Sequence, residues 1–286
     1  MKALIDLDIL PYSYGGMSFE DGSLMPEYMV KGKVDEKIQR IMENSGSDDW
    51  VGYLTHSSSN FRLDVGTILP YKGNRSGSTK PPHYQMLRDH ILATYPDKVT
   101  LVRNYEADDQ LAIDQYESIN QHLKGQLKDG DTIWVTQPYS EEMIGTYEDT
   151  VICTIDKDLM MVPGWHYNWN TDVRTLVVGV EGLRWFYKQC LTGDMTDNIK
   201  GLHGVGAKST LLSKLDAMDT EQQMFEHVYA EYEKRFGSYA DVFLIENGTL
   251  LWMMKDEEDK WVNTFNLLKT TMITNKENEN NDDNPF

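Results

Sequence analysis

The sequence predicts an α/β fold, with a mainly parallel sheet flanked by helices and a smaller helical region after it. Short apolar runs that end in polar or acidic residues recur through the first 155 residues, helical stretches separate them, and from residue 181 onward the pattern is helical. With 286 residues, of which 40% are hydrophobic, the chain can bury a full core in one large domain with a smaller satellite.

Four apolar runs are predicted to be strands, because each is too short for a helix and is flanked by turn residues. They are Ala3–Ile5, Trp50–Leu54, Val99–Val102 and Val151–Ile155. Such runs are typical of buried strands in a parallel sheet. Ligands bind beyond the carboxyl ends of strands in these sheets, so we expect Asp6 and Asp156, which lie at two such ends, to face one crevice.

Helices are expected between and after these strands. The candidate helices are residues 35–43, 84–94 and 107–122, then 183–191, 209–215 and 221–236, with further apolar clusters at 244–254 and 261–268. Residues 129–149 look like an insertion with an extra strand or hairpin at Thr132–Thr136, and we assign no chemistry to it.

The chain is expected to have three regions: residues 1–182 as the sheet-based core, 183–274 as the helical region, and 275–286 as a tail. The tail is acidic, rich in asparagine and almost without apolar residues, so it cannot offset its own ordering entropy and should be disordered. We interpret it as a solubilising tail, with docking of replication proteins or self-occupation of a basic groove as the alternatives.

Cysteine usage and hydropathy exclude several classes of protein. The two cysteines, Cys153 and Cys190, have neither CxxC nor Cys/His spacing, which argues against a disulfide scaffold and a zinc site and favours buried core thiols. No basic leader precedes Ala3, and no segment approaches the ~18 apolar residues of a membrane span. We therefore expect a soluble, cytoplasmic protein with no membrane partner.

The net charge of −19 would ordinarily argue against a nucleic-acid partner, because phosphates are drawn to basic surfaces. The distribution of charge matters more than the total. Many acids fall in tight clusters or in the tail, whereas basic residues concentrate in one stretch, at Arg62, Lys72, Arg75, Lys80 and Arg88. The global charge therefore does not exclude DNA.

Four tight clusters of carboxylates are the most informative feature of the chain. They are Asp6 with Asp8, Glu106 with Asp108 and Asp109, Asp156 with Asp158, and Asp194 with Asp197. Taken singly, each cluster is more often a loop or helix-cap feature than a ligand. Acids gathered in one crevice repel one another and need a compensating cation, so together they indicate a hard divalent metal. Two Mg²⁺ ions about 3.5–4 Å apart suit phosphodiester hydrolysis.

A glycine-rich turn follows the last cluster. Ala207 stands where a P-loop needs lysine after its last glycine, and the segment follows a predicted helix, so a P-loop is not expected. A hairpin between two helices fits better: Gly204 and Gly206 allow close backbone approach, the amides from Ser209 onward point at a phosphate, and Lys208 adds charge. The alternative is a plain helix-loop-helix turn.

These residues and their order resemble the phage-type 5′-nuclease family, the flap endonucleases and 5′→3′ exonucleases related to the nuclease domain of bacterial DNA polymerase I. The matching stretches, in the family's order, are residues 3–6, 61–64 through 70–75, 105–109, 154–158, and 193–201 through 208.

The resemblance implies a PIN-like twisted sheet whose carboxylates hold two Mg²⁺ or Mn²⁺ ions, and a helix-hairpin-helix that grips duplex DNA, with a potassium ion. It implies metal ligands at Asp6, Glu106, Asp108, Asp109, Asp156, Asp158, Asp194 and Asp197. It also implies that Lys72 and Arg75 steady the scissile phosphate, that Tyr71 stacks on a terminal base, and that DNA is bound by Arg62, Tyr71, Lys72, Arg75, Gly204, Gly206, Lys208 and Ser209.

The sequence departs from the family in two places. The acid usual after the second strand is absent, because the chain reads Thr55 and His56 there, and Asp8 is the candidate replacement ligand. His56 is either a ligand or phosphate contact or an ordinary surface histidine. The segment from Arg75 to Arg88 is too short for the arch that some relatives thread with a flap.

We therefore expect a metal-dependent 5′–3′ exonuclease, with flap or structure-specific endonuclease activity as an accompaniment, acting on DNA with 5′ ends, nicks, gaps or flaps in phage replication or recombination. Two competing hypotheses remain. One is a structure-specific DNA-binding protein that kept the fold and lost the chemistry, and the other is a PIN-type ribonuclease.

Overall fold

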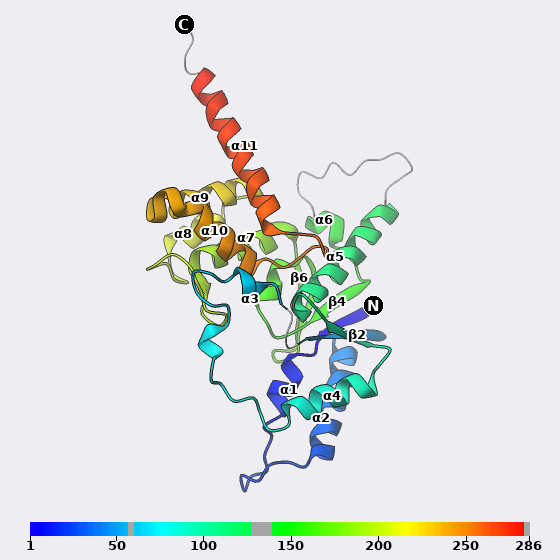
Figure 1. The fold of residues 1–286 in the computed structure, drawn as a ribbon. Coiled ribbons are helices and arrows are strands. Elements are labelled where there is room, and N and C mark those ends of the chain that lie inside the picture. Colours follow the sequence, from blue (N-terminus) through cyan, green and yellow to red (C-terminus); the bar gives the residue numbers. More distant parts are fainter. Residues whose placement is uncertain (57–59, 127–138, 283–286) are drawn as a thin grey trace. The chain divides into compact units, whose positions relative to one another are not determined.

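The computed structural model describes residues 1–56, 60–126 and 139–282 (Figure 1). The strand predicted at Thr132–Thr136 lies outside the described residues. The chain forms two compact units: unit 1 comprises residues 1–61 and 77–179, and unit 2 comprises residues 62–76 and 180–286. The predicted boundary near residue 182 is close to the observed one, but residues 62–76 join the second unit.

Unit 1 is built on a six-stranded sheet in the order β3-β2-β1-β4-β5-β6. The strands are β1 Lys2–Asp6, β2 Asp49–Thr55, β3 Val99–Val102, β4 Thr150–Cys153, β5 Gly164–Asn168 and β6 Val173–Val177. All neighbouring pairs are parallel except β5 with β6. The predicted α/β class with a mainly parallel sheet is confirmed.

Helices cover the sheet of unit 1 (Figure 1). They are α1 Ile9–Tyr14, α2 Glu27–Asn44, α4 Tyr84–Thr94, α5 Ala107–Gln126 and α6 Glu141–Ile144, with a 3₁₀ turn η2 at Asp158–Met161. Helix α2 begins earlier than residue 35, directly after Pro26, whose fixed φ suits a helix start. Its buried residues Val30, Val34, Ile38 and Ile41 recur at helical spacing and face the core.

The alternation of side chains along β1 decides which face carries chemistry. Ala3 and Ile5 belong to the hydrophobic core that α2 and α4 cover. Side chains alternate along a strand, so Asp6 points to the other face. Tyr53, which is paired in register with Asp6, has its hydroxyl bonded to Asp114 of α5. Asp6 therefore lies on the α5 face of the sheet.

Unit 2 is mostly helical. Its elements are α3 Arg62–Val65, η1 Gly73–Arg75, α7 Gly179–Thr192, β7 Gly193–Asp194, β8 Ile199–Lys200, α8 Thr210–Leu215, α9 Glu221–Phe236, η3 Gly237–Tyr239, α10 Ala240–Leu251 and α11 Trp261–Asp282. Its core is aromatic: the Phe186 ring lies edge-on against Trp252 and Trp261 at 4.8 Å between centroids. The predicted helical C-terminal region is confirmed.

The C-terminal tail differs from the prediction. Helix α11 continues to Asp282, so residues 275–282 are helical rather than disordered. Trp261, Phe265 and Met272 are buried and anchor the helix, and extending an anchored helix costs far less than nucleating one. Composition alone missed this effect. Residues 283–286 lie outside the described residues.

Two further expectations concern burial and membranes. Cys153 and Cys190 are buried and free, as predicted, and burial raises the pKa of Cys153 to about 12. Among the helices that the structure describes, none has the length and apolar character needed to cross a membrane.

Candidate functional site

Asp6 and Asp156 lie at the same edge of the sheet in unit 1. Strands β1 and β4 are parallel neighbours, with Ile5 opposite Cys153, so both chains leave the sheet on the same side. Thr154 links the two acids: its hydroxyl donates to Asp6 Oδ2 at 3.0 Å and accepts from the Asp156 N–H at 3.0 Å. The two acids therefore lie at one edge of the sheet, as their positions after strands predict.

Asp6 is in an electrostatically costly position. It is 3% exposed, and burial, followed by the negative charges of Asp8 and Asp156, raises its pKa to about 8. Hydrogen bonds from the Thr154 hydroxyl and the Asp8 N–H only partly offset this rise. A carboxylate in such surroundings stays ionised at neutral pH only beside a compensating cation. Asp6 is therefore a group that a nearby cation would stabilise.

The acids at the start of α5 are held by caps. Asp109 is fully buried, and its Oδ2 accepts the Glu106 N–H at 3.1 Å. The next free amide, that of Ala107, donates to the hydroxyl of Thr55 at 2.9 Å. Helix N-termini favour both arrangements, because their first amides have no partner within the helix. The cap function predicted as the alternative for this cluster is therefore present for Asp109.

Asp8 is part of a clamp that also contains Thr55 and Arg88. The buried Arg88 guanidinium donates to Asp8 Oδ1 at 2.6 Å and to the Thr55 carbonyl at 2.5 Å. The Thr55 N–H in turn donates to Asp8 Oδ2 at 3.0 Å. The charge of Asp8 is thus balanced by an arginine, which does not support its prediction as the replacement metal ligand. Arg88 is buried rather than part of a basic surface.

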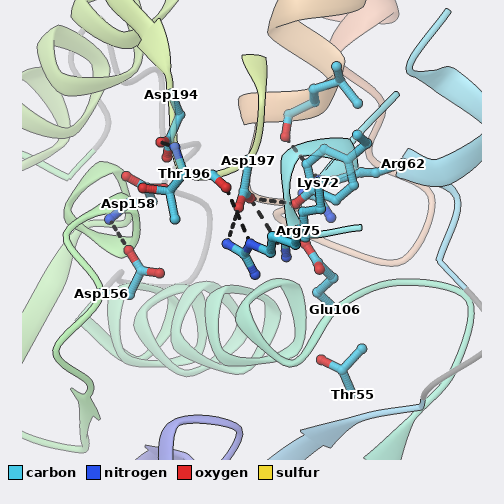
Figure 2. Close-up of polar contacts among 12 residues, drawn as sticks. Thr55, Arg62, Lys72, Arg75, Glu106, Asp156, Asp158, Asp194, Thr196 and Asp197 are labelled. Atoms are coloured by element: carbon cyan, nitrogen blue, oxygen red, sulfur yellow. Dashed lines mark hydrogen bonds and ion pairs between the residues drawn. The ribbon is translucent and has the colours of Figure 1, made fainter. Parts of the chain in front are cut away.

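Asp156 and Asp158 form a local turn at the start of η2. The Asp158 N–H donates to Asp156 Oδ1 at 2.8 Å (Figure 2). Asp156 is exposed and Asp158 is half-buried. Within residues 1–56, 60–126 and 139–282, no three His, Cys, Asp or Glu side chains are grouped so that they could hold a metal ion between them.

In unit 2, Asp197 forms ion pairs with both predicted catalytic cations, Lys72 and Arg75. Arg75 Nη2 lies 2.6 Å from Asp197 Oδ1, and Lys72 Nζ lies 3.6 Å from Oδ2 (Figure 2). The Tyr71 hydroxyl donates to Oδ2 at 2.7 Å. The sequence predicted Lys72 and Arg75 as a pair but not that they meet Asp197. The buried Asp194 accepts the Thr196 N–H at 2.7 Å and so holds the same turn.

Two predicted DNA contacts are corrected by burial. Arg62 is 1% exposed, and its guanidinium donates to the carbonyls of Leu250 and Trp252, where α10 ends and leaves carbonyls without helical partners. It is a core residue and cannot reach DNA from there. Tyr71 is 5% exposed, so its ring is not available to stack on a base. Motif position alone did not reveal either burial.

The glycine-rich turn follows the short β7–β8 hairpin rather than a helix directly. Gly204 has a φ of +84°, which explains the glycine there, whereas Gly206 shows no backbone or packing requirement for one. The Ser209 hydroxyl caps α8 by accepting the Leu211 N–H at 3.3 Å. Lys208 is exposed. His56 lies at the end of β2, where its N–H donates to the Val102 carbonyl.

Sequence reasoning missed Thr154, Thr55 and Arg88 as site residues. Thr154 stands two residues before Asp156, a spacing that allows a hydroxyl to cap the following turn, and this signal was readable. The roles of Thr55 and Arg88 depend on contacts between distant segments and had no sequence signal.

The solved structures that are similar to this chain include two proteins of bacteriophage T5. A bacteriophage T5 flap endonuclease, in a pseudo-enzyme-product complex with DNA and metal ions, is 14% identical over 87% of this chain and 98% of its own, with a TM-score of 0.48. T5 5′-exonuclease with bound divalent zinc ions is 16% identical over 88% of this chain and 96% of its own, with a TM-score of 0.49. No protein-family model and no curated protein matches the sequence. Similarity at this level assigns no site or activity to the chain.

Proposed function

We propose that this protein is a metal-dependent nuclease that hydrolyses DNA phosphodiesters near 5′ ends, acting as a 5′–3′ exonuclease with accompanying flap endonuclease activity. The observation that carries the proposal is the placement of Asp6 and Asp156 at one edge of the parallel sheet, tied through Thr154, with the acidic start of α5 on the Asp6 face. The ordered motifs that resemble phage 5′-nucleases supply the substrate class.

The residues of unit 1 that would hold divalent ions are Asp6, Glu106, Asp108, Asp109, Asp156 and Asp158. Bound Mg²⁺ or Mn²⁺ would supply a hydroxide nucleophile at neutral pH and stabilise charge on the leaving oxygen. Thr154 keeps Asp6 and Asp156 oriented, and burial of Asp6 keeps bulk water from screening its charge. No protein nucleophile is required.

The residues of unit 2 are proposed to handle phosphate. Lys72 and Arg75 would neutralise charge on the scissile group, and Asp197 fixes the two cations in one place. Asp194 and Asp197 remain proposed ligands for a second ion. Gly204, Gly206, Lys208 and Ser209 are the proposed duplex grip, with K⁺ bound to their carbonyls.

The direct test is cleavage of three 5′-labelled substrates, a duplex, a flap and an RNA/DNA hybrid, each with Mg²⁺ and with EDTA. We expect release of short 5′-labelled products from the DNA substrates in Mg²⁺ and none in EDTA. Cleavage of the RNA strand alone would favour a ribonuclease, and identical products in EDTA would refute the metal dependence.

A second candidate is a structure-specific DNA-binding protein without nuclease activity. Two observations favour it: Thr55 stands where the family usually has an acid, and the described residues contain no ready-made group of three metal ligands. Tight binding of flap DNA with no cleavage in Mg²⁺ or Mn²⁺ would select this candidate. A role in phage replication in the host cytoplasm, with partners bound through the acidic tail, follows only from the first candidate.

A further inference from the structure

A pocket lined only by residues of unit 2 has no role in the proposed cleavage reaction. Its volume is about 200 Å³, and it is lined by residues 68–69, 198–201, 203, 235–236, 243, 246–247 and 250. Pockets for drug-sized ligands hold ~300–1,000 Å³, so this one can enclose a single ring system rather than a whole drug-sized ligand.

One wall of the pocket is aromatic. The rings of Phe236 and Phe243 stack face to face, with centroids 4.0 Å apart and planes 5° from parallel, and both residues line the pocket. Leu69 and Leu250 extend the apolar surface. Flat aromatic ligands match such a wall, because stacking adds to the burial of apolar area.

A buried amide in the pocket lacks a hydrogen-bond donor. Asn247 is 7% exposed, and its Nδ2 donates to the Lys200 carbonyl and to the Tyr232 hydroxyl, both at 2.9 Å. Its Oδ1 has no hydrogen-bond partner anywhere in the described part of the chain. This oxygen is not among the fully buried unpaired polar atoms of the described residues, so a ligand can reach it, and an N–H of a ligand would supply the hydrogen bond that it lacks.

The acid in the pocket is already occupied. Glu246 Oε1 accepts the Ile68 N–H at 2.7 Å, and Oε2 accepts the Thr67 hydroxyl. Its carboxylate is therefore committed to holding the chain segment before Leu69. The acceptor that is left for a ligand is Asn247.

The outer residues of the pocket are basic. Lys200, His203 and Arg235 line it, are exposed, and form no ion pair among the described residues. Arg235 also lies in the last turn of α9, where a cation complements the helix dipole. In a chain with a net charge of −19, the two neighbouring cations Lys200 and Arg235, which have no acidic partner among the described residues, favour an anionic ligand.

We propose that this pocket binds a single unpaired nucleotide. The base packs against the Phe236–Phe243 wall and donates an N–H to Asn247 Oδ1, and the phosphate lies at Lys200 and Arg235. The nucleotide is either a free mononucleotide or an unpaired residue of a DNA strand. The inference does not depend on the proposed cleavage reaction.

The test uses 2-aminopurine, whose fluorescence is quenched by stacking on aromatic rings. The full-length protein in EDTA is titrated into 2-aminopurine deoxynucleoside monophosphate in one arm. In the other arm the same base is the single unpaired overhang of a short duplex, with the base inside a blunt duplex as its reference. We expect saturable quenching, and the arm with the tighter binding identifies the source of the nucleotide.

Matched variants locate the binding. Arg235→Gln and Lys200→Gln should each weaken binding about tenfold through loss of a charge-assisted contact, and Phe243→Leu should remove the quenching. Lys234→Gln is the control, because Lys234 neighbours Arg235, pairs with Glu231 and does not line the pocket. No saturable quenching in either arm, or quenching unchanged in Arg235→Gln and Lys200→Gln, would overturn the proposal.

Discussion

At the scale of single residues, Asp6 is the side chain whose surroundings most clearly call for a cation. It is buried, lies beside two other carboxylates and has a pKa raised to about 8. Folded proteins rarely tolerate such a group without a proton or a cation beside it. Thr154 is the residue that keeps this group next to Asp156.

Removing one carboxylate at this edge should stop catalysis without unfolding the protein. Asp156→Asn preserves shape and is expected to lower Mg²⁺-dependent cleavage by about a hundredfold or more, because several kcal/mol of charge stabilisation is lost. DNA affinity in EDTA should be retained. The control is Asp149→Asn, which changes an exposed acid directly before the first residue of β4, at the end of the strand away from Asp156. This variant should remain active. Parallel loss of cleavage and DNA binding would contradict the assignment.

His166 predicts a pH-dependent stability that is independent of the nuclease proposal. Burial lowers its pKa to about 4, although the hydrogen bond with the Val162 carbonyl opposes the shift. Unfolded histidine titrates near its ordinary value, so the unfolded state takes up a proton that the folded state excludes. This residue should cost no stability above about pH 6.5 and on the order of 3 kcal/mol by about pH 4.

The measurement for His166 is urea unfolding of the wild type and of His166→Gln between pH 4 and pH 7. The wild type should lose more stability than the variant as the pH falls, since glutamine does not titrate. Parallel curves for the two proteins would show that His166 does not contribute.

At the scale of elements, the Asp8–Thr55–Arg88 clamp joins three segments of unit 1. Arg88 in α4 holds Asp8 after β1 and the carbonyl of Thr55 at the end of β2, and the Thr55 hydroxyl caps α5 at Ala107. Thr55 thus hydrogen-bonds to both members of the Asp8–Arg88 ion pair and to the first amide of α5, the helix that carries Asp109. The clamp occupies the position where the family usually has an acid.

The clamp predicts how Asp8 behaves when changed. Asp8→Asn leaves the buried Arg88 charge uncompensated, so the free energy of unfolding should fall by roughly 1–3 kcal/mol. Because Asp8 is paired with arginine rather than metal, the loss should be equal in Mg²⁺ and in EDTA. Asp49→Asn breaks the exposed pair with Lys98 at the other end of β2 and should change stability little. A loss seen only in Mg²⁺ would restore Asp8 as a metal ligand.

The helix cap gives a separate prediction. Thr55→Val removes the acceptor for the Ala107 N–H and should destabilise the protein by about 1 kcal/mol, whereas Thr55→Ser keeps the hydroxyl and should recover most of that loss. Thermal unfolding of the three proteins measures this difference. Equal unfolding temperatures for the valine and serine variants would show that the cap contributes nothing.

At the scale of the whole molecule, local patterns predicted much of the fold. Strands β1 to β4 and helices α4 and α9 follow from apolar runs and helical spacing. Strand β5 was missed because its sequence, Gly164–Asn168, mixes aromatic and polar residues, and β6 was missed as an antiparallel edge strand. The tail was assigned from composition, which ignores the anchoring of α11.

The candidate site was only partly predictable, because some of its contacts join segments that are far apart in the sequence. Acids at strand ends can be read from sequence, because parallel strands end at one edge. The bonds of Asp197 to Tyr71 and Arg75 join segments more than 120 residues apart, and they bring residues 62–76 into unit 2. No local pattern encodes such pairing.

The salt dependence of DNA binding tests whether Lys208 contacts a phosphate. If Lys208 contacts a phosphate, Lys208→Ala should weaken binding to all sequences alike and reduce the slope of log affinity against log salt by about one. Lys276→Ala, an exposed lysine of α11, is the control and should leave the slope unchanged. An unchanged slope for Lys208→Ala would exclude this contact.

The central claim, that the carboxylates around Asp6 hold a catalytic metal, is tested most directly by titrating Mn²⁺ into the protein and following free Mn²⁺ by electron paramagnetic resonance. The account predicts saturable binding by the wild type, marked weakening in Asp6→Asn and Asp156→Asn, and unchanged binding in Asp149→Asn. Absence of binding by the wild type, or equal binding by all four proteins, would contradict it.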